Sequence, residues 1–165
     1  FLNWKSDKNV REVKILRKYH IQDRGDYVAY NKLCGRISKI VALLAKLPAT
    51  DTFRQTVTSQ LIDKLYNMGL IPQRKSLAAV EKLAASAFCR RRLPVVMVRL
   101  KMAETLKEAI TFIEQGHVRV GPETVTDPAF LVTRTLEDFV SWTDRSKIRE
   151  KIQRYHNLVD DYELL

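Results

Sequence analysis

Apolar residues recur at helical spacing through the first half of the chain. Over residues 26–46 they follow the one-face pattern of an amphipathic helix, with basic residues largely on the opposite side. The apolar positions are Tyr30, Leu33, Cys34, Ile37, Val41 and Leu44, and the basic positions are Lys32, Arg36, Lys39 and Lys46. Proline lacks the amide hydrogen that a helix needs, so Pro48 ends this predicted helix.

Two more helices are predicted before residue 86. Thr52 is a candidate N-cap for the first, and Gly69 stands where helices commonly end in a left-handed residue. Its apolar face comprises Phe53, Val57, Leu61, Leu65 and Met68. Ser76 is the candidate start of a shorter helix. The apolar positions of that helix are Leu77, Val80 and Leu83.

The pattern then predicts two short helices. Pro94 is tolerated best in a first turn, so one helix starts near it, and Thr105 with Glu108 has the spacing of a capping box for the other. The apolar faces comprise Leu93, Val96, Met97 and Leu100 in the first helix, and Leu106, Ala109, Ile110 and Ile113 in the second. Gly116 is placed to close the second helix with a positive φ angle.

Short strands are predicted after this glycine. Residues 117–120 alternate polar and apolar side chains, and residues 123–126 follow a turn at Gly121–Pro122. Residues 138–142 supply a third strand, and residues 147–155 return to a basic helical pattern.

These elements predict an α+β fold in three parts. Residues 1–85 form an N-terminal helical region, and residues 86–143 form a small domain of two antiparallel helices with a small curled antiparallel sheet. Residues 144–165 form a C-terminal helical tail.

The charge balance indicates an anionic partner. Lys and Arg number 29 against 19 acidic residues, a formal net charge of +10 in 165 residues, which favours nucleic acid. Cys34 and Cys89 are far apart and outside any C-x-x-C pair, so free thiols are expected. No apolar run is long enough to span a bilayer. We expect no membrane segment, metal site, cofactor or small-molecule substrate.

Candidate RNA contacts gather in the small domain. Arginine offers a planar fork to phosphate oxygens and stacks on unpaired bases, and helix N-termini attract phosphate. The candidates are Arg90, Arg91, Arg92, Arg99, Lys101, Thr105, Lys107, His117 and Arg119. A run of arginines can also be a solvated surface, Thr105 a structural cap, and His117 a hairpin residue bonded to backbone.

Several spacings agree with a known family. The stretch RRLPVVMVRLKMAETLKEAITFIEQGHVRV, followed by DPAFLV, resembles the S4 RNA-binding domain family of ribosomal proteins. The segments YNKLCGRI, KLYNMGLI, CRRRLPVVMVRLKMAET and FIEQGHVRVGPETVTDPAFLVTR resemble the eukaryotic S4-domain subfamily of the U3 small nucleolar ribonucleoprotein. With these segments the resemblance covers nearly the whole chain.

The resemblance implies a non-catalytic RNA-binding factor of ribosome assembly in the nucleolus. Its implied RNA partners are small nucleolar RNA and precursor ribosomal RNA, whose pairing it would assist during small-subunit rRNA processing. Its implied protein partners are an acidic scaffold protein and a Brix-domain protein of the same subcomplex.

The chain departs from the family pattern at two turns. Many relatives have glycine where Lys101 stands, so either this turn avoids a positive φ angle or Lys101 adopts an uncommon conformation. The hairpin tip carries Gly121, Pro122 and Glu123 in place of Asn-Gly, so a longer tip is expected, with a carboxylate unsuited to phosphate.

Other functions stay open at this point. One is a small-subunit ribosomal protein, and another is a protein-interaction adaptor with secondary RNA contact. Large apolar residues near the N-terminus would dock on a partner or on the chain's own surface: Trp4, Ile15, Leu16 and Tyr19. Catalysis is not expected, because residues 1–85 lack a glycine-rich phosphate loop and a nucleophile beside a base. Because the chain begins with Phe1, we expect that its natural N-terminus precedes it.

Overall fold

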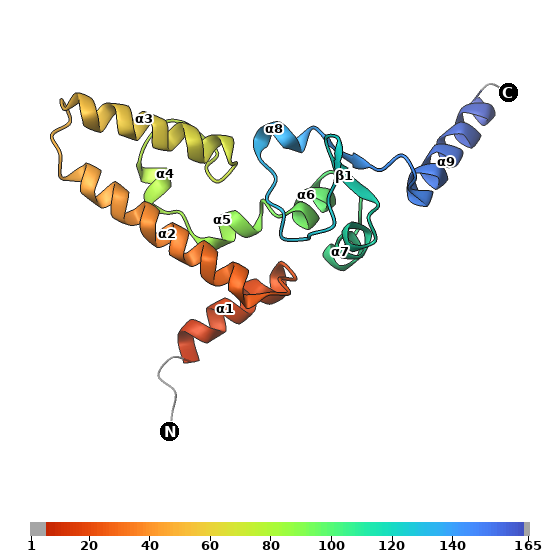
Figure 1. The fold of residues 1–165 in the computed structure, drawn as a ribbon, viewed down its shortest axis with the longest axis horizontal. Coiled ribbons are helices and arrows are strands. Elements are labelled where there is room, and N and C mark those ends of the chain that lie inside the picture. Colours follow the sequence, from red (N-terminus) through yellow and green to blue (C-terminus); the bar gives the residue numbers. More distant parts are fainter. Residues whose placement is uncertain (1–5, 164–165) are drawn as a thin grey trace.

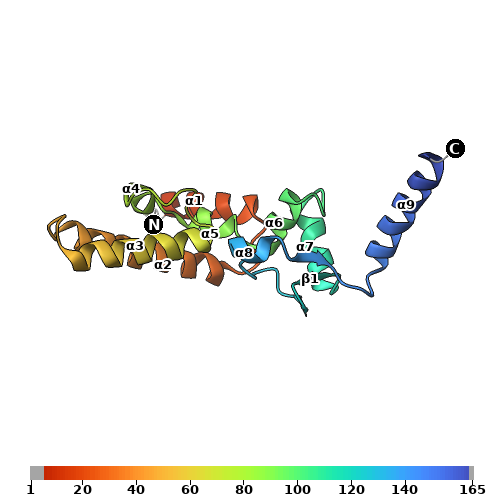
Figure 2. The same cartoon turned by 90° about the horizontal axis from the view of Figure 1, so that it is seen from above.

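The chain forms an elongated arrangement of a helical region, a small helix–sheet region and a projecting C-terminal helix (Figure 1). The computed structural model describes residues 6–163, with side chains described for residues 10–157, so Trp4 lies outside the described residues. Helix α9, Lys147–Glu163, points away from the other elements (Figure 2). The predicted α+β class is confirmed.

Among the described residues, the helical region contains three long helices and two short ones. These are α1 Ser6–Lys18, α2 Arg24–Ala45, α3 Thr52–Asn67, α4 Ala78–Glu81 and α5 Ala85–Cys89. Helix α5 packs in the core of the helical region, so this region extends past the predicted boundary at residue 85. The Asp51 carboxylate accepts the Phe53 amide hydrogen at 2.9 Å, so Asp51 caps α3 and the predicted cap at Thr52 is wrong. The helix predicted from Ser76 is only one turn long and lacks a side-chain cap.

A first hydrophobic core fills this region. It contains the predicted stripe of α2 at Tyr30, Cys34 and Val41, and Tyr30 stacks on Phe88 of α5 with ring centroids 5.4 Å apart. Tyr19 is buried in the same core, so it docks on the chain's own surface. Leu33, predicted to be buried, is 40% exposed because the stripe is wider than the elements that cover it.

The small domain consists of two packed helices and a three-stranded antiparallel sheet. Helices α6 Leu93–Arg99 and α7 Leu106–Glu114 pack on each other, and the strands β1 Val118–Val120, β2 Glu123–Thr124 and β3 Val140–Trp142 pair in the order β2-β1-β3. The strands are each shorter than predicted, and the one-turn helix α8, Arg134–Glu137, was not predicted. Val120 pairs with Glu123 across the two-residue turn Gly121–Pro122, so the expectation of a longer hairpin tip is wrong.

A second hydrophobic core lies inside this domain. Its buried members are Leu93, Val96, Met97, Ala109, Ile113, Val118, Val120, Val132 and Val140. Most of the predicted faces of α6 and α7 therefore point into this core. The exceptions are Leu100, which is 40% exposed, Leu106, which is half-buried, and Ile110, which is buried outside this core. Two backbone hydrogen bonds join the start of α6 to the segment before α8: Leu93 N–H to Phe130 O and Val132 N–H to Arg91 O, both 2.8 Å.

Four helix ends share one backbone motif. After the last turns of α1, α3, α6 and α7, a residue with positive φ donates its amide hydrogen three residues back, and the next residue donates five residues back. The positive-φ residues are His20, Gly69, Lys101 and Gly116. Glycine suits this position because it has no Cβ, so His20 and Lys101 hold an unfavourable conformation. Lys101 has a φ of 60°, so of the two alternatives for this turn the structure has the uncommon conformation at Lys101.

The first turn of α7 confirms half of the predicted capping box. Thr105 Oγ1 accepts the Glu108 amide hydrogen at 3.2 Å. The Glu108 carboxylate accepts the amide hydrogen of Glu104, one residue before the expected position at Thr105. Both side chains still occupy amide hydrogens that the helix leaves unpaired.

Lys101→Gly is expected to raise the free energy of unfolding by about 0.5–1 kcal/mol. Relief of the left-handed conformation contributes roughly 1–2 kcal/mol, and the greater chain entropy of unfolded glycine removes part of it. Urea denaturation measures the change. Lys107→Gly, inside helix α7, is the matched control and should lower stability by about 1 kcal/mol; equal changes at both positions would contradict the assignment.

Cys89 is expected to resist alkylation in the native protein. It is fully buried, and burial raises the pKa of its thiol to about 11, so roughly one thiol in a thousand is ionised near pH 8. The neutral thiol favours the fold at lower pH, and this contribution is lost as pH rises from about 9 toward 11. Iodoacetamide labelling read by mass spectrometry tests this, with denatured protein as control; rapid native labelling would contradict the burial.

Candidate RNA interface

The nine candidate residues divide by exposure. Arg91 and Arg92 are buried, with exposed fractions of 5% and 3%. His117 and Arg119 are half-buried. The exposed candidates are Arg90, Arg99, Lys101, Thr105 and Lys107. Three consecutive arginines thus have two different environments.

Arg91 is held by the small domain. Its Nε donates to the Val132 carbonyl at 2.9 Å, and its two terminal nitrogens donate to Glu137 Oε2 at 3.2 and 3.1 Å. The guanidinium lies against Gly69 so closely that a Cβ there would be 2.6 Å from Nε. Gly69 is therefore required twice, for its φ of +79° and for the approach of Arg91.

Arg92 connects the small domain to helix α2. Its Nη1 donates to Asp26 Oδ2 at 3.0 Å and to the Tyr30 hydroxyl at 3.1 Å. Burial alone would lower the pKa of Arg92, but the hydrogen bonds that it donates to Asp26 and Tyr30 outweigh this effect, so its pKa is raised and its charge is retained. Burial also raises the pKa of Tyr30, with Arg92 opposing that change.

Arg134 of α8 makes a third connection that the sequence did not reveal. Its Nε donates to the Tyr66 carbonyl at 2.7 Å and its Nη2 to the Ile71 carbonyl at 2.8 Å, which satisfies backbone acceptors at the end of α3. Its guanidinium also lies 4.2 Å from the Tyr66 ring centroid. Arg134 was not among the candidate residues, and only its distant partners reveal this role.

Four arginines line one open cavity, which we call the arginine cleft. Its cationic members are Arg90, Arg91, Arg99 and Arg134, and its volume is about 380 Å³. The acidic lining residue Glu137 binds Arg91 and forms an ion pair with Arg99. Four guanidinium groups against one carboxylate leave an excess of positive charge beside the exposed Arg90.

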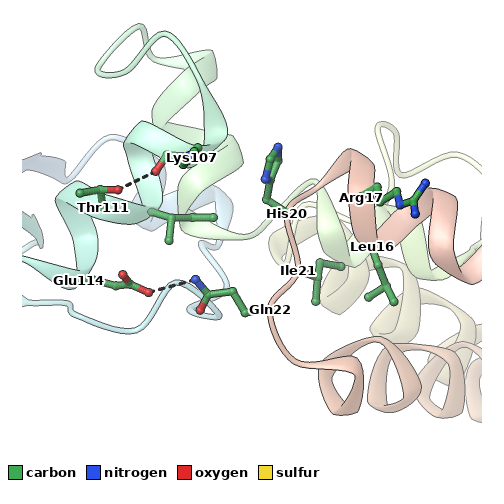
Figure 3. Close-up of a pocket in the computed structure, with 9 residues that line it drawn as sticks. Leu16, Arg17, His20, Ile21, Gln22, Lys107, Thr111 and Glu114 are labelled. Atoms are coloured by element: carbon green, nitrogen blue, oxygen red, sulfur yellow. Dashed lines mark hydrogen bonds between the residues drawn. The ribbon is translucent and has the colours of Figure 1, made fainter.

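Lys107 lies at a second cavity, which we call the junction cleft. It is an open cavity of about 650 Å³ between the α1–α2 connection and α7 (Figure 3). The residues lining it are Leu16, Arg17, His20, Ile21, Gln22, Lys107, Ile110, Thr111 and Glu114. The structure therefore brings Lys107 together with residues of the helical region and apart from the arginine cleft.

His117 and Arg119 support the connection to the tail. His117 Nδ1 is 2.9 Å from Ser146 Oγ, the oxygen that also accepts the Ile148 amide hydrogen at the start of α9. Arg119 Nε donates to Ser141 Oγ at 3.0 Å, and its Nη1 lies 3.3 Å from Asp144 Oδ2. Arg119 therefore keeps only part of its guanidinium for an external anion.

The described residues offer binding groups more than reactive ones. Among the side chains of residues 10–157, no group of three His, Cys, Asp or Glu lies close enough to hold a metal ion. The described helices include none with the length and apolar character of a membrane span. Cys34 and Cys89 are both buried free thiols, as predicted.

Two family models match the chain and meet where the two hydrophobic cores meet, between Cys89 and Leu93. The family model described as "Ribosomal protein S4/S9 N-terminal domain" matches residues 1–90, and the "S4 domain" model matches residues 91–138. The "U3 small nucleolar ribonucleoprotein protein IMP3" of Saccharomyces cerevisiae is 51% identical over 99% of this chain and 90% of its own length. The chain belongs to the IMP3 family. The IMP3 protein of Homo sapiens is 50% identical with the same coverage.

The chain is also similar in sequence to ribosomal S4 proteins, at lower identity. "Small ribosomal subunit protein uS4" of Picrophilus torridus is 28% identical over 90% of this chain and 81% of its own length. The much higher identity to IMP3 proteins separates this chain from the ribosomal protein proper.

Arg91→Met and Arg92→Met are each expected to lower the free energy of unfolding by about 2–3 kcal/mol. Arg92→Met leaves the partly buried Asp26 carboxylate without its cation. Arg91→Met removes three hydrogen bonds, leaves the Val132 carbonyl without this donor, and leaves Glu137 paired only with Arg99. Arg90→Met is the matched control, because Arg90 is exposed, and should change stability by less than about 0.5 kcal/mol. Urea denaturation checks all three; equal losses across the triplet would refute the division between buried and exposed arginines.

Proposed function

We propose that this chain is a non-catalytic RNA-binding assembly factor of the U3 small nucleolar ribonucleoprotein. It binds small nucleolar RNA and precursor ribosomal RNA and assists their pairing during small-subunit rRNA processing in the nucleolus. The observation that carries this proposal is sequence identity: over 99% of its length the chain is 51% and 50% identical to two proteins named as U3 small nucleolar ribonucleoprotein components. The net charge of +10 agrees with an RNA partner.

The RNA surface that we propose differs from the full candidate set. Arg90, Lys101 and Lys107 contact phosphate through exposed side chains, and Arg99 does so beside Glu137. Arg91 and Arg92 act from the interior by fixing the position of Arg90 and α6. Thr105 caps α7, His117 bonds Ser146 before α9, and Arg119 bonds Ser141 of β3. These three residues contact RNA only through atoms that stay exposed.

An acidic scaffold protein and a Brix-domain protein are the proposed protein partners. Helix α2 supports an acidic partner, since it exposes Leu33, Ile40 and Leu43 in a helix whose residues 27–45 carry lysine and arginine but no acid. A basic apolar surface fits an amphipathic acidic segment. An adaptor role is therefore compatible with RNA binding.

RNA crosslinking in cells tests the proposed function. We expect crosslinks concentrated on the small nucleolar RNA and on the precursor segments that pair with it. Arg90→Gln/Lys101→Gln should weaken RNA binding in vitro and reduce the slope of log affinity against log salt by about 1.4, at roughly 0.7 per phosphate contact.

Lys46→Gln/Lys82→Gln provides the matched control for this pair. It removes the same charge from exposed positions of the helical region outside the proposed surface. Crosslinks confined to mature ribosomal RNA would assign the chain to the ribosome instead. Equal salt slopes for the two double variants would remove Arg90 and Lys101 from the interface.

A further inference from the structure

We propose that the junction cleft binds one unpaired nucleotide of the RNA, with its base over the apolar floor and its phosphate at the cationic rim. This inference rests on the proposed function and adds a base-binding site formed jointly by the helical region and α7. The site is separate from the arginine cleft, which contains no lining residue of the junction cleft.

The floor of the cleft suits the face of a nucleobase. Ile21 and Ile110 are 8% and 7% exposed and line the cavity from opposite sides, with Leu16 beside them. A volume of about 650 Å³ lies within the range of roughly 300–1,000 Å³ typical of small-ligand sites. An unstacked base can therefore enter without rearranging the backbone.

The rim supplies groups for both ends of a nucleotide. Arg17 and Lys107 are exposed cations that line the cleft from its two sides and suit a phosphate. In Figure 3 the Arg17 guanidinium points away from the gap, so Arg17 reaches a phosphate after its side chain rotates. Gln22 donates to Glu114 at 3.1 Å and closes one end with an amide and a carboxylate. These two groups match the amino and carbonyl groups on base edges.

His20 gives the cleft an aromatic ring at a structural cost. It occupies the positive-φ position after α1, with φ of 49°, where glycine would be more favourable. Its side chain is exposed and lines the cleft. Strained residues of this kind concentrate at binding sites, and an imidazole in this place stacks on a base.

The acidic residue in the cleft argues for RNA over an acidic peptide. Glu114 would repel a carboxylate-rich segment, whereas it accepts hydrogen bonds from the amino group of a base. A protein segment in the cleft is the competing result of the test below.

The test compares two RNA hairpins of equal length with the full chain. One is fully paired in its stem, and the other carries a single bulged 4-thiouridine. The wild-type protein should prefer the bulged RNA by about ten-fold, the size expected for stacking one base. Irradiation should crosslink the bulge to the peptide containing residues 17–22.

His20→Gly should abolish this preference while raising thermal stability, because it removes the ring and the backbone strain together. His20→Phe is the matched control, since it keeps an aromatic ring at the same backbone position and should keep the preference. Arg17→Ala should also reduce the ratio, whereas Arg11→Ala, on the same helix outside the cleft, should not.

The outcomes separate this inference from the proposed function. Tight RNA binding with no preference for the bulge, or crosslinks outside residues 17–22 and α7, overturns the nucleotide site and leaves the proposed function standing. Loss of the crosslink at residues 17–22 when an acidic peptide is added, but not when uridine monophosphate is added, assigns the cleft to a protein segment and overturns the nucleotide site too. Absence of binding to either RNA overturns both proposals.

Discussion

The structure depends on burying two positive charges between its two hydrophobic cores. Arg91 and Arg92 lie where the first core ends at Cys89 and the second begins at Leu93. Each finds its carboxylate far away in sequence, Arg91 at Glu137 and Arg92 at Asp26. A buried charge is tolerated only when it is paired and hydrogen-bonded, so these contacts fix how the helical region and the small domain meet. Both clefts lie between elements that these contacts hold together.

This arrangement explains which parts of the molecule the sequence could predict. Helical spacing correctly predicted α2, α3, α6 and α7, because each buries one face over several turns. It failed for Phe53 and Leu100, which are 64% and 40% exposed, because periodicity does not show where the covering element ends. It also missed α5 and α8, which are too short to show a period.

The candidate site was harder to predict because charge alone suggests exposure. Arg90, Arg91 and Arg92 look equivalent in sequence, and only partners 46 and 66 residues away distinguish them. The family likeness correctly identified the small domain, and the identity to IMP3 proteins extends it to the whole chain. No family pattern pointed to His20, whose position depends on the conformation after α1.

The long-range pairing of Arg91 also constrains how the protein is made. A ribosome releases the chain from its N-terminus, so Arg91 leaves the exit tunnel 46 residues before Glu137 and its cation has no carboxylate in the meantime. Arg134, which closes the end of α3, is likewise made long after the helix that it completes. The helical region can therefore complete its contacts only after residues 134–137 have been synthesised. The final packing of the two cores is then reached together.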